Sequence, residues 1–420
     1  MTPILHLTWK SVKNRQLAVG LTALAVALSV TLLLGVERLR NDARAGFAQT
    51  ISGTDLVVGA RSGPIQLLLY SVFHLGNATN EVSWNSYDVL LRHTAVEWLV
   101  PLSLGDSHRG FRVVGTNVDF FRHVQYGNHR SLVFAAGQPF DGLFEAVVGA
   151  EVAAQLGYAP GARIVLAHGS GEVSFVEHAN KPFTVSGVLA RTGTPVDRSV
   201  LVSLQAIEAI HLDWQGGAPI PGFTIAPEHV TKFDLAPKTI TAILVGLKFR
   251  ATVFSVQRFI NEYRGEPLLA ILPGATLQEL WGLLSVAEHA LFAISVLVVL
   301  VGLAGLVAVI VASLGERRRE LAILRALGAG PGDIFLLLAT ESLMLTLIGS
   351  ALGLGMLYGM IAGLAPVAEA RFGLILSMAP PAPREWLLLG AVLIAGLLAS
   401  VVPGYRAYRM SLADGMTVRI

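Results

Sequence analysis

The sequence predicts an α-helical membrane protein with four transmembrane helices and a large α+β extracytoplasmic domain inserted between the first and second spans. Three observations favour this fold class. Of 420 residues, 53% are hydrophobic and 14% charged, whereas soluble domains carry about 25% charged residues. Four stretches approach the roughly 20 apolar residues that are needed to cross a bilayer. A more polar segment, 37–289, separates the first two stretches and is long enough to form its own core.

The apolar stretches define the predicted spans, at 17–36, 290–314, 334–367 and 386–402. The first run is longer than the apolar region of a signal peptide, so we expect a retained anchor. The remaining segments are an amphipathic helix at 1–16, a loop at 315–333, a short external loop at 368–385 and a tail at 403–420. The chain has no cysteine, which excludes disulfides and thiolate chemistry.

Basic residues predict the orientation. They gather before the first span, between the second and third, and after the fourth: Lys10, Lys13, Arg15, Arg317, Arg318, Arg319, Arg325, Arg406, Arg409 and Arg419. Because loops rich in Lys and Arg stay inside the cell, we expect both termini and the 315–333 loop in the cytoplasm. The 37–289 segment then lies outside.

The external segment is predicted to begin and end in helices that continue the adjoining spans, at 37–50 and 276–288. Between these two stalks we expect a mixture of helices and strands, with a β-rich middle. The expected helices are 65–74, 203–210 and 251–263, and the expected strands are 55–58, 97–104, 110–115, 146–148, 163–167, 183–189, 199–204 and 239–247.

The loop between the second and third spans contains the sequence Glu-Arg-Arg-Arg-Glu-Leu-Ala-Ile-Leu-Arg-Ala-Leu-Gly, at 316–328. Leu321, Leu324 and Leu327 are spaced to favour one helical face, and Gly328 is suited to end the helix. A short basic helix of this kind could lie on lipid headgroups or bind a cytoplasmic partner. The simpler explanation of its arginines is that they set the topology.

The third predicted span carries a carboxylate and a series of glycines. A charge within a span is unfavourable and usually finds a partner, so we interpret Glu341 as a structural group and keep a proton relay as the alternative. The glycines are spaced for close helix packing, which we favour over a pore lining: Gly349, Gly353, Gly355, Gly359 and Gly363.

Ten of the 11 histidines fall in the external segment; apart from His289 at its last position they are His74, His93, His108, His123, His129, His168, His178, His211 and His229. Metal handling is conceivable, but no pair has a close ligand spacing, so we expect scattered surface side chains and no metal site. Hydrolase motifs such as Gly-x-Ser-x-Gly and His-Glu-x-x-His do not occur. The basic residues lie at membrane edges, which argues against nucleic-acid binding.

The chain resembles the MacB/FtsX-like permease family of ABC transporters, which includes the lipoprotein-extracting LolC and LolE. The most specific likeness is the 316–329 motif, followed by Ile334, Glu341 and the glycines from Gly349. Pro403-Gly-Tyr-Arg406 and the residues after it resemble the closing segment of the family. Phe111-Arg-Val-Val-Gly-Thr and similar runs look like its periplasmic core.

The resemblance implies a four-span permease of the bacterial inner membrane, a dimer with itself or a related chain, and a separate cytoplasmic ATPase that uses ATP and Mg. This chain contains no Gly-Lys pair and so no phosphate-binding Gly-x-x-x-x-Gly-Lys-[Ser/Thr]; we expect no cofactor on it. The loop would act as the coupling helix, with arginines pairing to acidic groups of the ATPase and Leu321 and Leu324 filling its apolar pockets. The residues implied are Glu316, Arg317, Arg318, Arg319, Glu320, Leu321, Leu324, Arg325 and Gly328.

ATP hydrolysis would then drive movement of the periplasmic domain, a mechanotransmission that exports or extracts a substrate, with a periplasmic adaptor or substrate protein as a further partner. One alternative is an FtsX-like regulator that activates a periplasmic or cell-wall partner. A second alternative, suggested by the histidines, is a transition-metal (zinc)-related ABC system. A third is a membrane-anchored sensor without an ATPase.

Overall fold

The computed structural model describes residues 16–50, 52–169, 176–215, 218–316, 318–372 and 376–409. Its residues separate into two compact units. The helical unit contains residues 16–42 and most of the chain after 285, and the sheet unit contains 43–284 together with 370–372. Besides α12 (Pro331–Phe372), whose last residues at 370–372 belong to the sheet unit, two helices have residues in both units and run without a break: α2 (Gln16–Thr50) and α10 (Pro273–Glu316).

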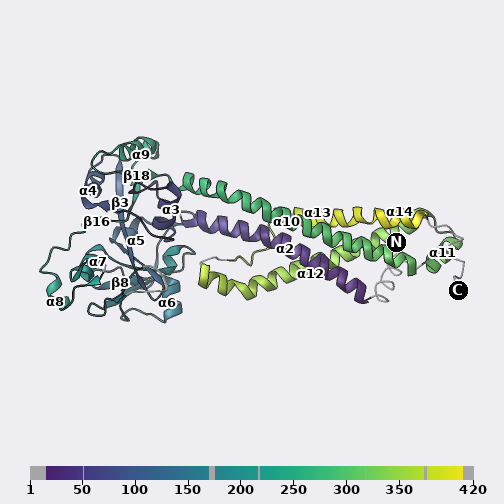
Figure 1. Ribbon diagram of the computed structural model, residues 1–420, viewed down its shortest axis with the longest axis horizontal. Coiled ribbons are helices and arrows are strands. Elements are labelled where there is room, and N and C mark those ends of the chain that lie inside the picture. Colours follow the sequence, from purple (N-terminus) through teal and green to yellow (C-terminus); the bar gives the residue numbers. More distant parts are fainter. Residues whose placement is uncertain are drawn as a thin grey trace. The chain divides into compact units, whose positions relative to one another are not determined.

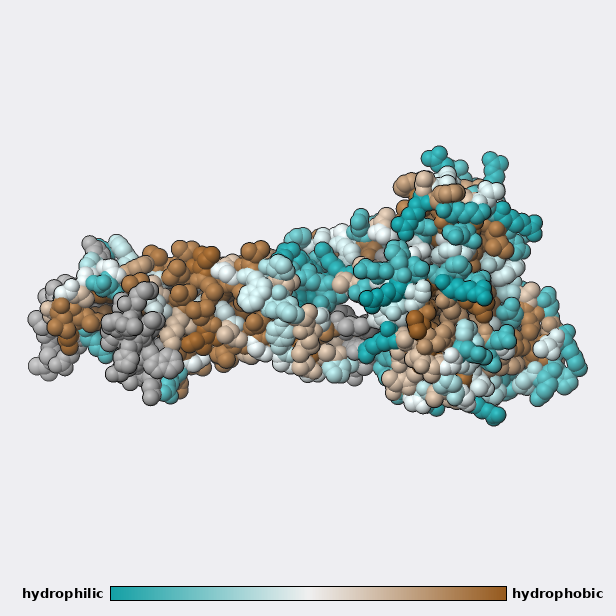
Figure 2. Space-filling model, turned by 180° about the vertical axis from the view of Figure 1, so that it is seen from behind, coloured by the Kyte–Doolittle hydropathy of each residue, from teal (hydrophilic) through white to brown (hydrophobic). Residues whose placement is uncertain are grey.

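The helical unit is built from long apolar helices (Figure 1). They are α2, α10, α12 (Pro331–Phe372), α13 (Pro383–Ala399) and the shorter α11 (Arg318–Ala326) and α14 (Val401–Arg409). Among the residues that the structure describes, four stretches are long and apolar enough to cross a membrane, at 16–50, 273–315, 331–368 and 383–407. Figure 2 shows apolar side chains over much of the outer surface of these helices, as expected of a surface that faces lipid.

The first three predicted spans each lie within one helix, and the fourth covers most of α13 and the first two residues of α14. Residues 37–50 continue α2 and residues 276–288 belong to α10, as the two stalks predicted from the sequence required. The boundary expected at 402/403 instead falls inside α14. Pro403 lies in the first turn of that helix, where a proline is tolerated because the missing N–H has no intrahelical acceptor.

The sheet unit is organised around one mixed sheet in the order β18-β1-β17-β3-β4-β13-β8-β12-β7. Strand β3 (Val96–His108) joins its two parts, pairing with β17 up to Leu102 and with β4 from Ser103. Two neighbouring pairs are parallel, β13 with β4 and β12 with β8. The other strands of this order are β1 (Leu56–Ala60), β4 (Phe111–Thr116), β7 (Phe134–Gly137), β8 (Glu145–Val148), β12 (Phe183–Leu189), β13 (Ser199–Ser203), β17 (Ala242–Leu247) and β18 (Leu268–Ile271).

Two predicted strands are interrupted. The run at 163–167 divides into β9 (Arg163–Ile164), which pairs with β12, and β10 (Ala167–His168), which pairs with β3. The run at 239–247 divides into β16 (Thr239–Ile240) and β17. The remaining short strands are β2 (Val82–Ser83), β5 (Gln125–Tyr126), β6 (Arg130–Ser131), β11 (Val176–Glu177), β14 (Trp214–Gln215) and β15 (Ala218–Pro219).

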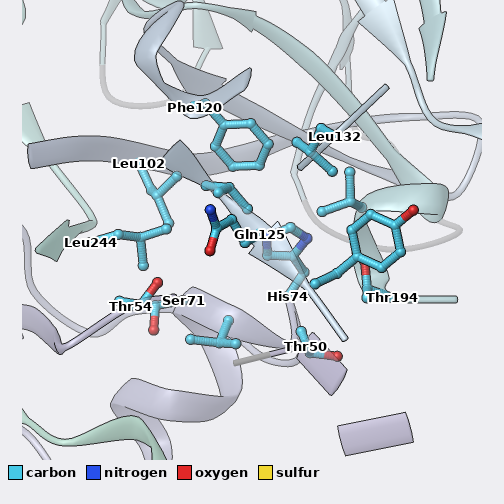
Figure 3. A pocket seen from close by; sticks show the side chains of 14 residues that line it. Thr50, Thr54, Ser71, His74, Leu102, Phe120, Gln125, Leu132, Thr194 and Leu244 are labelled. Carbon is cyan, nitrogen blue, oxygen red and sulfur yellow. The ribbon is translucent and has the colours of Figure 1, made fainter. Parts of the chain in front are cut away.

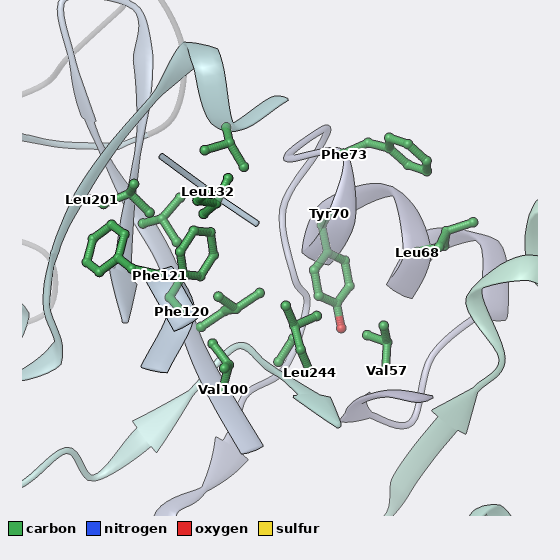
Figure 4. Close-up of a cluster of buried hydrophobic side chains, with 14 of the residues drawn as sticks. Val57, Leu68, Tyr70, Phe73, Val100, Phe120, Phe121, Leu132, Leu201 and Leu244 are labelled. Carbon is green, nitrogen blue, oxygen red and sulfur yellow. The ribbon is translucent and has the colours of Figure 1, made fainter. Parts of the chain in front are cut away.

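Helices cover the sheet and bury both of its faces. On β1, Val57 packs into the cluster drawn in Figure 4, whereas Leu56 and Val58 pack into a second cluster. This alternation follows from the two-residue period of a strand. The helices are α3 (Pro64–Val72), α4 (Trp84–Leu91), α5 (Asp119–His123), α6 (Ala150–Leu156), α7 (Leu204–His211), α8 (Pro227–Val230) and α9 (Val253–Asn261), with 3₁₀ turns at Pro195–Arg198 and Arg250–Thr252.

Candidate functional site

The connection between the second and third candidate spans is a short helix with a defined end. Gly328 has φ +100° and follows α11. Its N–H donates to the carbonyl of Arg325 (3.0 Å), and the N–H of Ala329 donates to that of Leu324 (3.0 Å). These two bonds form a Schellman motif, which favours glycine at the left-handed position. The predicted role of Gly328 in ending the helix is confirmed.

One side of α11 is attached to the rest of the helical unit. Leu321 is buried in the main apolar cluster of that unit, and Leu324 packs against it. The Arg325 guanidinium donates to the carbonyl of Ala407 in α14 (3.3 Å). Leu321 and Leu324 therefore already have contacts within this chain, and their contact with a partner stays a prediction.

The other side of α11, together with the residue that directly follows it, presents apolar side chains to solvent. Ile323 is 53% exposed and Leu327 is 80% exposed. They are four residues apart, so they share a helical face. Glu320 is also exposed, and the side chains of Glu316, Arg317, Arg318 and Arg319 lie outside the described part. An exposed apolar pair within a basic segment is a surface that a partner could cover.

The third span places its predicted polar group inside the helical unit. Glu341 is 5% exposed on α12. Its neighbour Ser342 donates to the carbonyl of Gly396 in α13 (2.7 Å), so this side of α12 faces another helix. Burial agrees with a structural role for Glu341, which stays a prediction alongside the proton relay.

Two of the five glycines lie at a close helix contact. A methyl group added at Gly349 would lie 2.6 Å from Cβ of Val26, and one at Gly353 would lie 2.6 Å from the carbonyl oxygen of Ala27. Both neighbours belong to α2. The corresponding space at Gly355, Gly359 and Gly363 holds nothing within 4 Å among the described residues, so the close packing expected there is not found within this chain.

An ionic network that the sequence did not predict joins α2 to the start of α13. Arg38 is 5% exposed, and its Nη1 lies 3.1 Å from Oε2 of Glu385, which is 1% exposed. Arg38 also donates to the carbonyls of Ser377 (2.9 Å) and Ala379. No local pattern could reveal this pair, because the two side chains are 347 positions apart in the sequence.

A small cavity in the sheet unit is lined by His74, with Leu102, Phe120, Gln125 and Leu244 among its neighbours (Figure 3). His74 has φ +55°, and its Nδ1 lies 2.9 Å from Oγ of Ser199. Burial, with a contribution from the charge on Arg112, lowers the pKa of His74 to about 4. The cavity volume of about 40 Å³ holds a few waters and is too small for a substrate.

The external histidines are not all scattered on the surface, and that expectation is wrong for three of them. His168, His178 and His211 gather with Asp106, each offering one ligand atom, and these atoms lie within 4.8 Å of one another. No local sequence pattern indicates this cluster, because its members come from β3, β10, α7 and the turn after β11. They meet only when β10 pairs with β3.

Comparison with known proteins gives two family matches. Residues 19–243, more than half of the chain, match the MacB-like periplasmic core domain. Residues 292–412 match the FtsX-like permease C-terminal region. No curated protein matches this chain.

Solved structures of the same kind are distant in sequence. The periplasmic region of MacB from Actinobacillus actinomycetemcomitans is 11% identical, with 55% of this chain and 94% of that chain covered and a TM-score of 0.34. The extracellular domain of the noncanonic ABC-type transporter YknZ from Gram-positive bacteria is 12% identical, with 52% and 99% covered and a TM-score of 0.31.

Proposed function

This chain belongs to the MacB/FtsX-like family of ABC transporter permeases, and on that premise we propose that α11 couples it to a separate ATPase in the cytoplasm. The observation that carries the proposal is the division of α11 into two sides. Leu321 and Arg325 attach the helix to the helical unit, while Ile323 and Leu327 remain exposed. A partner that covers these two side chains would gain apolar contact and would meet basic residues around it.

The attachment of α11 supports a mechanical link. Movement of the helix would act on the bundle through buried Leu321 and through the bond from Arg325 to Ala407. The Schellman end at Gly328 leads within three residues to the start of α12 at Pro331. A force applied at α11 therefore has short, packed connections to α12 and α14.

The outward part of this mechanism uses α2 and α10. Each helix has residues in the helical unit and in the sheet unit with no interruption. An unbroken helix transmits axial and rotational movement better than a loop, because each residue is held by i to i−4 hydrogen bonds. We propose that ATP hydrolysis in the partner moves the sheet unit on the outer side of the membrane and so exports or extracts a substrate. Both termini and α11 would lie in the cytoplasm, and a second permease chain would complete the assembly.

The experiment uses full-length permease co-purified with its ATPase and reconstituted in lipid nanodiscs. The double variant Ile323→Glu/Leu327→Glu is compared with Leu91→Glu, which changes a 55% exposed leucine of the sheet unit. We expect the first variant to lose the permease-dependent part of ATP hydrolysis by at least about tenfold, equivalent to about 1.4 kcal/mol of contact. The control should keep it. Full stimulation in both variants would refute coupling through α11.

A further inference from the structure

A second group of residues lies on the sheet unit and plays no part in the proposed coupling. His168 follows Ala167 in β10 and is the cross-strand partner of Asp106 in β3. His211 ends α7, and His178 follows β11. Nδ1 of His168 lies 3.2 Å from Oδ1 of Asp106 and 3.2 Å from Nε2 of His211, and the latter atom lies 3.6 Å from the same carboxylate oxygen.

Hydrogen bonding among these side chains does not satisfy all of their nitrogen atoms. Nδ1 of His211 lies 2.8 Å from the carbonyl oxygen of Ile207. A carbonyl can only accept, so this nitrogen carries the proton, and Nε2 of a neutral His211 presents a lone pair on the side where Nδ1 of His168 lies 3.2 Å away. This bond also fixes the orientation of the ring, as a backbone carbonyl commonly does for a metal-ligating histidine.

His178 is the clearest sign that the group has another purpose. Its side chain is 1% exposed, yet neither ring nitrogen has a hydrogen-bond partner among the described residues. Leaving a buried polar group without a hydrogen-bond partner is unfavourable.

We propose that Asp106, His168, His178 and His211 form a binding site for a divalent transition-metal ion, of which Zn²⁺ is the best fit. Ligand atoms around a tetrahedral Zn²⁺, at about 2.0–2.1 Å from the ion, lie about 3.3 Å from one another. The three contacts of 3.2, 3.2 and 3.6 Å match this spacing. Three imidazoles and one carboxylate also suit borderline metals, whereas sites for Mg²⁺ and Ca²⁺ use oxygen ligands.

The cluster is partly open to solvent, so an ion could enter and leave, and an aromatic ring lies beside it. The side chains of Asp106 and His178 are almost completely buried, while those of His168 and His211 are 35% and 27% exposed. The ring of Trp214 lies 4.2 Å from that of His178 and 5.4 Å from that of His168, centroid to centroid. The aromatic ring of Trp214 beside the ligands lowers the local dielectric constant, which strengthens the interaction between the carboxylate and the cation.

Binding would link separate parts of the sheet unit. The four ligands come from β3, β10, α7 and the turn that precedes β12. An ion held by all four favours the folded arrangement by RT ln(1 + [L]/Kd), because the unfolded chain does not hold these groups together. The site therefore makes the stability of this unit depend on the concentration of the metal.

The test uses the full-length protein in detergent, carrying no polyhistidine tag and stripped of metal with a chelator. Zn²⁺ is titrated in competition with a colorimetric chelator, and Co²⁺ is added separately to record its visible spectrum. We expect one Zn²⁺ per chain and the intense bands of four-coordinate Co²⁺, which Zn²⁺ abolishes by displacement. Substoichiometric Zn²⁺ binding, or only the weak bands of six-coordinate Co²⁺, would overturn the proposal.

Two variants and a matched control locate the ion. We expect His178→Ala to weaken Zn²⁺ binding at least 100-fold and Asp106→Asn, which preserves shape, at least tenfold. His229→Ala changes an exposed external histidine outside the cluster and should alter affinity less than twofold. Thermal melting of each variant verifies that it folds. The Co²⁺ spectrum of the unaltered chain tests the site independently of whether the variants fold. Equal affinity in the Asp106→Asn variant and the control would place any bound Zn²⁺ elsewhere.

Discussion

Replacing Lys181 with methionine is expected to destabilise the sheet unit strongly. Lys181 is 0% exposed, and its Nζ lies 2.5 Å from Oδ1 of Asp213, which is 2% exposed. The same carboxylate accepts from Nδ2 of Asn180 (3.1 Å) and from the N–H of Ile225 (3.2 Å). Burial opposes ionisation of Asp213, but the bonds from Lys181 and Ile225 outweigh it and hold the pKa of that carboxyl below its usual value.

The magnitude follows from what the substitution leaves behind. Methionine has nearly the same length but no charge, so the Asp213 carboxylate would keep only two neutral donors in a buried position. Breaking one partner of a buried ion pair costs about 3–5 kcal/mol. For a domain of this size each kcal/mol lowers Tm by about 2–4 °C, so the expected decrease is about 6–20 °C.

Calorimetry of the full-length protein in detergent measures this decrease. Lys248→Met is the matched control, because Lys248 is exposed and bonds only to the carbonyl of Thr94 among the contacts described; its effect should stay within about 0.5 kcal/mol. Adding Asp213→Asn to Lys181→Met removes the unpaired negative charge of Asp213 and should restore at least half of the decrease in Tm. Equal Tm values for the two lysine variants, or strictly additive losses in the double variant, would refute the ion-pair reasoning.

Three further predictions concern the rest of the chain. Gly353→Ala should lower Tm by an amount equivalent to about 1–3 kcal/mol, because the new methyl group meets a carbonyl oxygen of α2. The control Gly359→Ala should leave Tm unchanged or slightly higher. Equal Tm values for the two variants would contradict close packing of Gly353 against α2. Glu385→Gln should cost about 3–5 kcal/mol by leaving Arg38 buried without its carboxylate, measured as loss of monodisperse protein after heating. The pKa of His74 is lowered to about 4, so the neutral ring stabilises the fold above pH 6.5, and this contribution of up to about 3 kcal/mol is lost as the pH falls toward 4. The variant His74→Gln should therefore flatten the dependence of Tm on pH between these two values. An unchanged slope would argue against this role of His74.

Features set by neighbouring residues could be predicted from the sequence. The four apolar runs identified the spans because membrane insertion depends on local composition. Gly328 could be assigned as a helix end because the left-handed conformation strongly favours glycine. The family resemblance is confirmed by the two matching family models, which cover the external domain and the C-terminal spans.

Features that depend on distant residues could not be predicted. Glu385 and Arg38 are each surrounded by unremarkable sequence, and only helix packing brings them together. His168 and Asp106 likewise meet because β10 pairs with β3. A search for metal ligands that are close in the sequence cannot find this cluster, because its members are far apart in the sequence.

Two patterns in the sequence do not identify the neighbour of the helical face that they describe. The amphipathic spacing of α11 predicted an apolar face correctly, but Leu321 on that face packs within the chain. The glycine spacing in α12 predicted close packing, but with 3.6 residues per turn Gly355 and Gly359 project to a different side from Gly349. Only the side toward α2 is closely packed among the described residues.

The most direct test of the account is a crosslinking measurement at Leu327 in native membranes. The chain has no cysteine, so Leu327→Cys introduces a single thiol directly after α11, at a position that is 80% exposed. A photoreactive group can be attached to this thiol after the membranes are opened. The account predicts an adduct with a nucleotide-hydrolysing subunit and no labelling of intact cells by a membrane-impermeant maleimide. Labelling from outside the cell, or adducts that contain no ATPase, would contradict it.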